Sequence, residues 1–449
     1  MGGVIALFLY SFYPEFLAHG KLVNTDVPAA LGFVLVLYLY WRFIRSLSFR
    51  NAILLGVGMG VGVLLKQSVL LPIAVILLVS SFSVLVKFMW RSVSEFFKEA
   101  GLTCFSLLVA LIVIYGMYAF ASLNYPREDL MLHVNVFMDE WNVTLPDIIW
   151  SGLDSTFWRP LGLFVVGVFR EIRRSESYGL RYFMGSYSND GWWYFFPVLY
   201  FYKSPAVFHF LTGFGLWGLV HKYKYKFMKH PQEKFVPFFI IALTIIWYTF
   251  IAMSSTLNIG FRHLLPVIPL VMILIAVGLR DLIYTQKKIV KSIFAVLAIL
   301  TVWVAVFEFP YYLSYYNVFS GGTKNGYTIS QDSDYFWDQE YKRLGEWIAS
   351  NNIDHMYVDC GASKERILSY YGKDSIVMFP GSSTWAHSGL IEPITNLPKG
   401  EFLAICATTL YEAYFIWETD TWVLTENYPT LRVREPDFRV GMSMFVFRM

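Results

Sequence analysis

Charged residues are scarce in this chain of 449 residues, and their shortage excludes several classes of protein. Asp, Glu, Lys and Arg make up 15% of the sequence, whereas a soluble domain usually carries about 25%. The 36 basic and 33 acidic residues leave a formal net charge of +3, too little for a basic nucleic-acid-binding surface. Hydrophobic residues reach 56%, which excludes a disordered chain and an ordinary soluble enzyme.

Cysteine is also scarce, so neither a disulfide framework nor a cysteine-based zinc site can be built. Cys104 lies inside an apolar run, where we expect a small core residue. Cys360 and Cys406 both lie in the C-terminal third, and the sequence leaves open whether they form one disulfide. The chain also lacks the Walker, dinucleotide-binding, HExxH and GxSxG motifs of common nucleotide-, zinc- and serine-dependent enzymes.

Long apolar runs take the place of charge in this sequence. The mean hydropathy is +0.48, and crossing a bilayer takes about 20 apolar residues. Aromatic residues, 19% of the chain, gather at the ends of these runs, as residues at a membrane interface do. We expect nine spans, at residues 1–14, 27–41, 52–65, 68–86, 101–122, 203–220, 236–252, 264–280 and 289–309. The segment 52–86 could instead be one long helix, tilted or broken at Lys66 and Gln67.

Basic residues follow the second, fourth, sixth and eighth predicted spans. Their clusters lie at residues 42–50, 87–98, 222–229 and 280–291. If the spans alternate in direction, every cluster faces the same side, which the positive-inside rule assigns to the cytoplasm. The segments that then lie on the outer side are 16–26, 123–190, 254–263 and 310–449. Nearly all residues capable of chemistry belong to these outer segments.

Residues 310–449 differ in pattern from the apolar part of the chain. Short strand-like runs lie at residues 353–359, 375–379 and 402–406, and helix-like segments lie at 337–350 and 364–371. Alternation of strands and helices predicts a small α/β domain. We therefore expect a polytopic α-helical membrane protein, with a transmembrane domain over residues 1–309 and an extracytoplasmic α/β domain over 310–449.

The first outer segment is short and polar and ends at Asp26, directly before a predicted span. A carboxylate at the membrane edge can hold a divalent cation against a phosphate, or act as a base. A structural alternative is that Thr25 or Asp26 caps the helix whose first turn contains Pro28. The polar neighbours of Asp26 in this segment are Glu15, His19 and Lys21.

Two more segments place cations at a predicted membrane edge. Arg262 and His263 begin a span within the run 258–266 (NIGFRHLLP). The arginine can hold a phosphate with two N–H groups, or it can extend into the headgroup layer. Lys203 follows the aromatic run 191–197 (GWWYFFP) and has apolar neighbours. A lysine in such a place must reach water, an acid or a lipid phosphate.

Three aspartates between Asp332 and Asp338 are spaced like the start of a calcium-binding loop. They lack the glycine and the distal glutamate that an EF-hand needs. We therefore expect Ser333 or Asp334 to cap the helix that follows.

Several of these blocks resemble one known family when they are taken in order. The blocks are AHGKLVNTDVP (18–28), GWWYFFP (191–197), KSP (203–205), NIGFRHLLP (258–266), LSYYN (313–317) with Gly321 and Gly322, and DSDYFWDQ (332–339). Together they resemble the lipid-carrier-dependent glycosyltransferases of the GT-C superfamily. The chain is most similar to the protein O-mannosyltransferase and aminoarabinose-transferase group, glycosyltransferase family 39 and its relatives. The resemblance covers residues 14 to 345.

The resemblance implies an enzyme that moves a sugar from a polyprenyl-phosphate carrier to a protein, lipid or glycan on the outer face. In such enzymes basic residues bind the donor phosphate, often with a divalent cation such as Mg²⁺ or Mn²⁺. Asp26 matches the acidic position near that phosphate, which makes it the candidate catalytic residue and metal ligand. Arg262 and His263 match the phosphate-contacting loop, and Lys203 matches a lysine of the aromatic block. With no classical signal peptide at Met1, the resemblance indicates a multi-pass protein of the bacterial inner membrane.

The chain departs from the family pattern in two places. Family members carry an outer loop with an acidic pair before the block that contains Asp26, so we expect about two spans and the catalytic base to precede this sequence. The family's Asp-Trp-Gly-Gln run is altered here to FWDQ at residues 336–339. Two alternatives to an enzyme stay open. One is a non-catalytic protein of this fold that binds a carrier lipid or a partner. The other is a transporter of lipid-linked sugars, although the predicted spans contain few charges.

Overall fold

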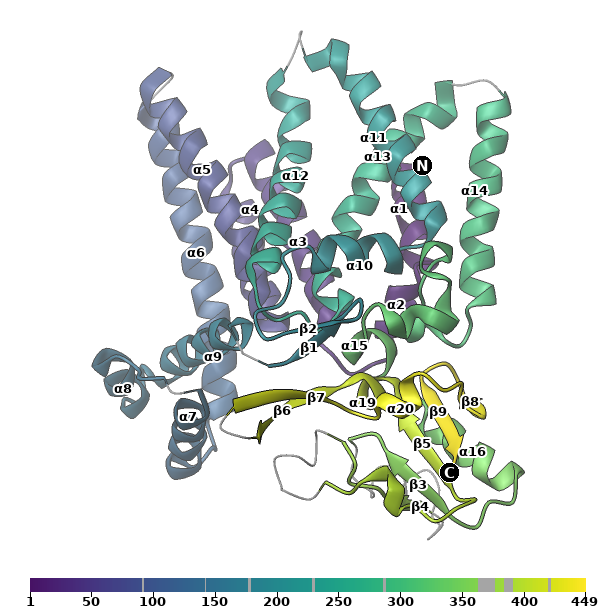
Figure 1. Ribbon diagram of the computed structural model, residues 1–449. Coiled ribbons are helices and arrows are strands. Elements are labelled where there is room, and N and C mark those ends of the chain that lie inside the picture. The colour runs from purple at the N-terminus through teal and green to yellow at the C-terminus, as the bar shows by residue number, and fades with distance from the viewer. Residues whose placement is uncertain are drawn as a thin grey trace.

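Helices dominate the computed structural model, and a small sheet lies toward the C-terminus (Figure 1). The structure describes residues 1–90, 93–141, 143–176, 179–227, 231–285, 288–361, 376–382, 391–418 and 421–449. In this part of the chain 4 helices are long and apolar enough to cross a membrane: Asp26–Arg45, Val93–Ser122, Val236–Ser254 and Lys288–Phe307. Shorter apolar helices cover Gly2–Ser11, Phe49–Leu65, Gln67–Ser83 and Ala206–His221. Each predicted span thus overlaps a helix, while the count of nine spans stays a prediction.

The first half of the chain forms one side of a helical bundle. Its helices are α1 (Gly2–Ser11), α2 (Pro14–His19), α3 (Asp26–Arg45), α4 (Phe49–Leu65), α5 (Leu70–Trp90) and α6 (Val93–Ser122). Helix α4 packs closely on α6 because glycines line its surface. A Cβ atom added at Gly56 would lie only 2.4 Å from the carbonyl oxygen of Ser106. Helix α4 therefore tolerates no larger residue at this contact without a shift of the backbone.

The segment 52–86 is not one helix. Lys66 adopts an extended backbone, with φ −163° and ψ 134°, and ends α4. A 3-10 turn, η1 (Gln67–Val69), leads into α5. The reversal brings Lys66 beside the beginning of α3, where its ammonium group meets Asp26.

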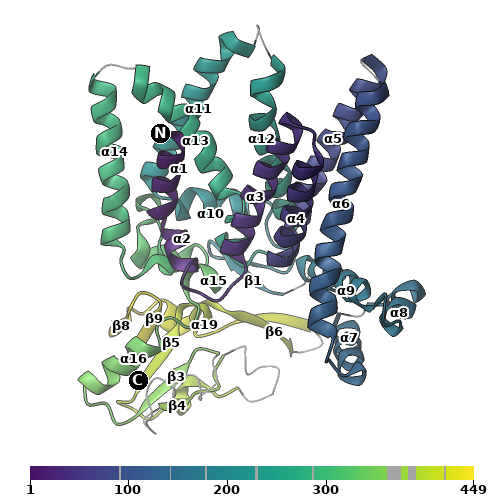
Figure 2. The same ribbon diagram turned by 180° about the vertical axis from the view of Figure 1, so that it is seen from behind.

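In the second half of the bundle, helices also meet closely at glycines. Its helices are α10 (Phe195–Lys203), α11 (Ala206–Phe227), α12 (Pro231–Ser254), α13 (Ile268–Thr285) and α14 (Lys288–Phe307), with the 3-10 turn η2 (Phe261–Leu264) between α12 and α13. Helices α11 and α13 touch through glycine, since a Cβ added at Gly278 would lie 1.9 Å from the carbonyl oxygen of Gly215. Helix α1 packs against α13 and closes this side (Figure 2).

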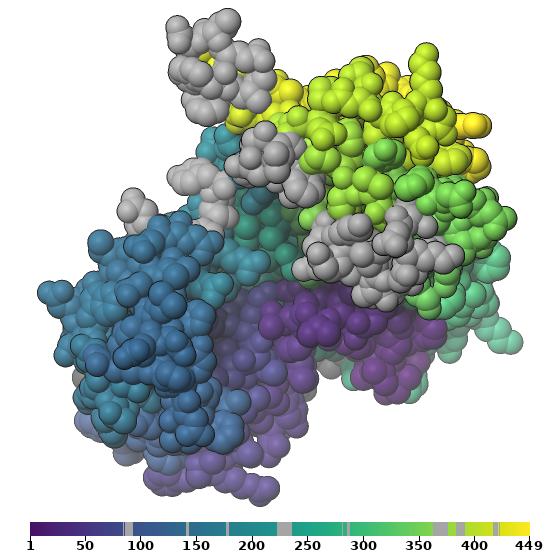
Figure 3. Space-filling model, turned by 90° about the horizontal axis from the view of Figure 1, so that it is seen from below, coloured from purple at the N-terminus to yellow at the C-terminus, as the bar shows by residue number. Residues whose placement is uncertain are grey.

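The loop between α6 and α10 carries structure of its own. It contains α7 (Arg127–Trp141), α8 (Asp147–Asp154), α9 (Arg159–Ser175) and a hairpin of β1 (Arg181–Phe183) with β2 (Ser186–Ser188). These helices share a small apolar core that includes Leu153 and Val166. Seen from the sheet end, α7 to α9 form a mass separate from the C-terminal domain (Figure 3).

The C-terminal region contains a mixed five-stranded sheet in the order β4-β3-β5-β9-β8. Its strands are β3 (Met356–Asp359), β4 (Ile376–Met378), β5 (Phe402–Cys406), β8 (Phe438–Val440) and β9 (Met444–Arg448). Strand β3 pairs in parallel with β4 and β5, whereas β9 runs antiparallel to β5 and β8. A separate hairpin joins β6 (Ala413–Glu418) to β7 (Thr421–Glu426). The three strands predicted from sequence are confirmed as β3, β4 and β5.

Short helices complete this region. They are α15 (Asp332–Tyr335), α16 (Tyr341–Ser350), α19 (Ala407–Tyr411) and α20 (Pro429–Arg432), with 3-10 turns η3 (Tyr312–Ser314), η4 (Val318–Ser320), η5 (Thr323–Thr328) and η6 (Ile394–Asn396). The helix expected at 337–350 begins only at Tyr341, and the one expected at 364–371 lies outside the described residues. The predicted cap is wrong, because Asp334 accepts a hydrogen bond from the amide of Phe261 and neither α15 nor α16 has a side-chain cap.

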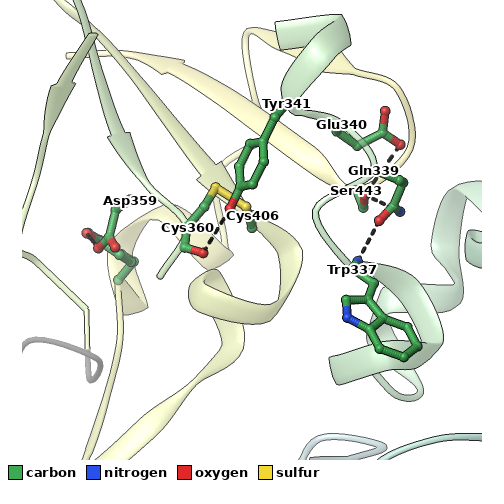
Figure 4. Close-up of a disulfide and its surroundings, with 9 residues drawn as sticks. Trp337, Gln339, Glu340, Tyr341, Asp359, Cys360, Cys406 and Ser443 are labelled. Atoms are coloured by element: carbon green, nitrogen blue, oxygen red, sulfur yellow. Dashed lines mark hydrogen bonds between the residues drawn. A yellow bond between two sulfur atoms is a disulfide. The ribbon is translucent and has the colours of Figure 1, made fainter. Parts of the chain in front are cut away.

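A disulfide joins Cys360 to Cys406 at the ends of neighbouring strands (Figure 4). The parallel register pairs Asp359 with Ile405, so the two cysteines follow directly and their Cα atoms lie 5.0 Å apart. The hydroxyl of Tyr341 donates to the carbonyl oxygen of Cys360 at 3.4 Å and ties α16 to the same point. The pairing that the sequence left open is therefore present, and it fixes the carboxyl ends of β3 and β5 to each other.

Candidate functional site

A cavity of about 1000 Å³ lies where the beginning of α3, the break after α4, helix α9 and the turn η2 meet. One part of its wall is polar and contains Asp26, Lys66, Arg262 and His263. Another part is apolar, built from residues of α4, α5 and α6 such as Leu64, Leu71 and Met117. A ligand that fits both parts must carry a charged group and an apolar segment.

Asp26 is the buried carboxylate of this cavity and has two cations beside it. Its side chain is nearly inaccessible to solvent. The Nζ atom of Lys66 lies 2.5 Å from Oδ1, and Nη1 of Arg262 lies 3.9 Å from Oδ2. The helix cap is also resolved: Thr25 occupies the cap position without a side-chain bond, and the Asn24 side chain accepts from the Asp26 amide. Asp26 thus serves to gather cations, and the capping interpretation of its carboxylate is wrong.

Arg262 is held at the cavity wall by an aromatic ring. Its guanidinium carbon lies 4.5 Å from the centre of the Trp337 ring, a cation–π contact. Both side chains line the cavity. The arrangement fixes the guanidinium near Asp26 and leaves it able to donate hydrogen bonds to an anion that enters.

His263 contributes a neutral group. Burial, together with the nearby Lys66 and Arg262 charges, lowers the pKa of its imidazole to about 3. The hydroxyl of Tyr248 donates to the backbone carbonyl of His263 at 2.7 Å and fixes the residue. Because the imidazole carries no charge at neutral pH, it can offer a hydrogen bond to a ligand without adding to the positive charge of the cavity.

Lys203 lies in a different place from the other predicted phosphate-binding residues. Its side chain is fully buried, and its Nζ lies 3.0 Å from Oε1 of Glu15. The same ammonium group donates to the carbonyl oxygens of Leu313, at 2.9 Å, and Asp334, at 2.6 Å. These three partners match its three donors, and Lys203 does not line the cavity.

Glu15 and His19 belong to this second cluster as well. The Nε2 atom of His19 lies 3.4 Å from Oε2 of Glu15, one turn away on α2. The side-chain amide nitrogen of Asn24 lies 3.1 Å from Nδ1 of His19, and this hydrogen bond links the cluster to the segment before Asp26. Lys21 is exposed and lies outside the cavity lining. Glu15, His19 and Lys203 therefore form a second, buried polar cluster outside the cavity lining.

The surroundings of Asp26 do not fit a divalent cation. Its two oxygens face Lys66 and Arg262, and a metal ion there would be repelled by both. Within the described ranges no group of three or more His, Cys, Asp or Glu side chains could hold a metal. The cations already present can neutralise an anionic ligand.

The sequence does not link several residues of the cavity to Asp26. Lys66 stands at a break between apolar runs, where a lysine must reach water, an acid or a lipid phosphate, and Trp337 stands in the altered family block. Arg170, Glu171 and Arg174 of α9 also line the cavity. They lie in an outer loop with many charges, and nothing in their local pattern links them to Asp26.

No family model, curated protein or solved structure matches this chain in comparisons with known proteins. Lys66 and Arg262 supply positive charge, His263 supplies an uncharged hydrogen-bonding group, and the apolar wall can receive a hydrocarbon chain. This combination suits a phosphate attached to a lipid.

Proposed function

We propose that this chain is a multi-pass membrane glycosyltransferase that takes a sugar from a polyprenyl-phosphate carrier and passes it to a protein, lipid or glycan acceptor. The carrier phosphate binds beside Lys66 and Arg262, and the polyprenyl chain follows the apolar wall. Transfer takes place on the extracytoplasmic side of the bacterial inner membrane, where the C-terminal domain with its disulfide also lies. Disulfides persist in that compartment.

The observation that carries this proposal is the joining of two unlike surfaces in one cavity. Asp26, Lys66 and Arg262 lie at its polar part, and Leu64, Leu71 and Met117 belong to its apolar part. A soluble sugar or a nucleotide would leave the apolar wall without a partner. A fatty ligand without charge would leave two cations facing a hydrocarbon, which is unfavourable. A lipid phosphate satisfies both surfaces.

The same charges suit the chemistry of transfer. When the bond between the sugar and the phosphate breaks, the carrier phosphate gains negative charge. Lys66 and Arg262 are in place to stabilise this charge, and Asp26 keeps them in position beforehand. Groups that are already oriented stabilise the developing charge without reorganisation at the moment of reaction.

The test compares cells that lack this chain with cells that express it. If the proposal is correct, the deletion causes a polyprenyl-phosphate sugar to accumulate, and mass spectrometry of the extracted lipids identifies the sugar. Expression of the wild-type chain removes the accumulated lipid, whereas the Arg262→Ala and Asp26→Asn variants do not. The proposal fails if the deletion leaves the polyprenyl-phosphate lipids unchanged.

A second candidate is a protein that binds the carrier lipid without transferring its sugar. The observation in its favour is that both oxygens of Asp26 face cations, which makes this carboxylate a poor base. Purified chain would then bind undecaprenyl phosphate, and deletion of the chain would cause no donor to accumulate.

A further inference from the structure

A second carboxylate, on helix α9, lines the same cavity as Asp26. Glu171 lies on α9, near the end of the helix, and its side chain is exposed. Gly167, Glu171 and Ser175 are spaced four residues apart, so they share one face of α9, and all three line the cavity. Glu171 is therefore in the middle of the helix face that closes the cavity.

Both ends of this helix face contact the chain segments that carry the cations. At Gly167 the helix approaches so closely that an added Cβ would lie 2.5 Å from Nε2 of Gln67, the residue after Lys66. At Ser175 the backbone carbonyl accepts a hydrogen bond of 2.8 Å from Oγ of Ser255, in the segment that leads to Arg262. Glu171 lies between these two contacts along α9 and lines the same cavity as Lys66 and Arg262.

The two carboxylates of the cavity differ in what surrounds them. Asp26 is buried between cations, which keeps its oxygens engaged. Glu171 forms no ion pair or hydrogen bond within the described part of the chain, although Arg170 and Arg174 are its neighbours on α9. A general base needs a lone pair that no cation occupies and that can be reached from the cavity. Glu171 meets these conditions and Asp26 does not.

We propose that Glu171 is the general base of the transfer, in place of the acidic loop that the family resemblance predicts; the inference rests on the proposed glycosyltransferase function. The carboxylate of Glu171 accepts the proton from the acceptor hydroxyl or amine as its oxygen or nitrogen attacks the anomeric carbon of the sugar. The bond between that carbon and the phosphate oxygen breaks. Its electron pair leaves with the polyprenyl phosphate, which Lys66 and Arg262 hold. The proton on Glu171 then passes to water.

The experiment introduces Glu171→Gln into the full chain and expresses it in cells from which the chain has been deleted. Glutamine keeps the shape of the side chain but cannot accept the proton. We expect the rate at which the accumulated polyprenyl-phosphate sugar is consumed to fall about 100-fold or more, within the range for loss of a general base. Purified Glu171→Gln protein should still bind undecaprenyl phosphate as the wild type does, measured by native mass spectrometry.

Two further variants show whether the effect belongs to this carboxylate. Glu171→Asp should restore part of the rate, because the proton acceptor is kept. Glu176→Gln is the matched control: Glu176 follows the same helix, is exposed and pairs with Arg173, and its loss should leave the rate unchanged. Consumption of the donor by Glu171→Gln at the wild-type rate overturns the inference and leaves the proposed function intact. Absence of donor accumulation in the deleted cells overturns both.

Discussion

The Nζ atom of Lys66 lies 2.5 Å from Oδ1 of Asp26, although 40 residues separate the two in the sequence. The contact forms because α4 ends at Lys66 and the chain turns back toward the beginning of α3. The Lys66 side chain is partly accessible, whereas the Asp26 side chain is buried, so the cation is the more exposed member of the pair. An exposed cation beside a buried carboxylate suits a cavity that receives an anion.

The first prediction concerns this ion pair. Replacing Lys66 by methionine removes a cation from the proposed phosphate site, and we expect transfer to fall roughly 100-fold, as for loss of one group that stabilises transition-state charge. The rate is measured as donor consumption in cells that express only the variant. Lys342→Met is the control, because Lys342 is exposed and pairs with Glu346 on the surface of α16. Equal rates for both variants would contradict the role given to Lys66.

The second prediction separates Lys203 from the phosphate site. Lys203 is fully buried against Glu15, so Lys203→Met leaves a carboxylate without its partner. Breaking a buried pair costs about 3–5 kcal/mol. We therefore expect a clearly lower thermal midpoint for the purified protein in detergent, while undecaprenyl phosphate binds normally to the protein that remains folded.

A double variant tests the cause of that loss. Adding Glu15→Gln to Lys203→Met removes the unpaired charge, and part of the lost stability should return. If Lys203→Met keeps the wild-type thermal midpoint but loses binding of undecaprenyl phosphate, Lys203 contacts the phosphate as the sequence had predicted, and the structural role is wrong.

The cavity shows how far the sequence alone could lead. Asp26, Arg262 and His263 were predicted because each stands where a polar segment meets an apolar run. Lys203 has the same local pattern, yet it is distinguished by Glu15, a partner that no local pattern reveals. Glu171 was missed for the opposite reason, since its neighbours in the sequence are also charged.

The same limit applies to the fold. Strands β3, β4 and β5 were predicted because each lies in a short strand-like run. The order β4-β3-β5-β9-β8 could not be, since it depends on pairing between segments far apart in the chain. The edge position of β8 beside β9 follows from that pairing and from the turn between them.

The third prediction concerns the disulfide between Cys360 and Cys406. Protein that is denatured without a reductant should take up one maleimide, at Cys104, and three after reduction. The bond closes a loop with a sequence separation of 46 residues, and replacing both cysteines by serine should destabilise the domain by about 4 kcal/mol. Three maleimides before reduction would show that the bond is absent in the native protein and would remove one argument for an extracytoplasmic domain.

Asp359 lies next to this disulfide and is buried at the end of β3. Burial raises the pKa of its carboxyl from 3.8 to about 7, although the Tyr428 hydroxyl donates to it at 2.5 Å. The folded state therefore keeps a proton on Asp359 in the range where the unfolded chain has lost it. Because the folded state binds more protons between pH 4 and 7, rising pH must reduce stability across that range.

The fourth prediction follows from this sign. Raising the pH from about 4 to about 7 should weaken the C-terminal domain by an amount on the order of 4 kcal/mol from Asp359, with no further loss from this group above pH 7. Asp359→Asn stays neutral in both states and should flatten that dependence. Hydrogen exchange of the β3 amides in the full chain, measured at pH 5 and pH 7.5, provides the comparison. Glu346→Gln, at an exposed position on α16, should behave as the wild type does. If Asp359→Asn and the wild type lose protection equally as the pH rises, Asp359 is ionised in the folded protein and its buried environment has been misjudged.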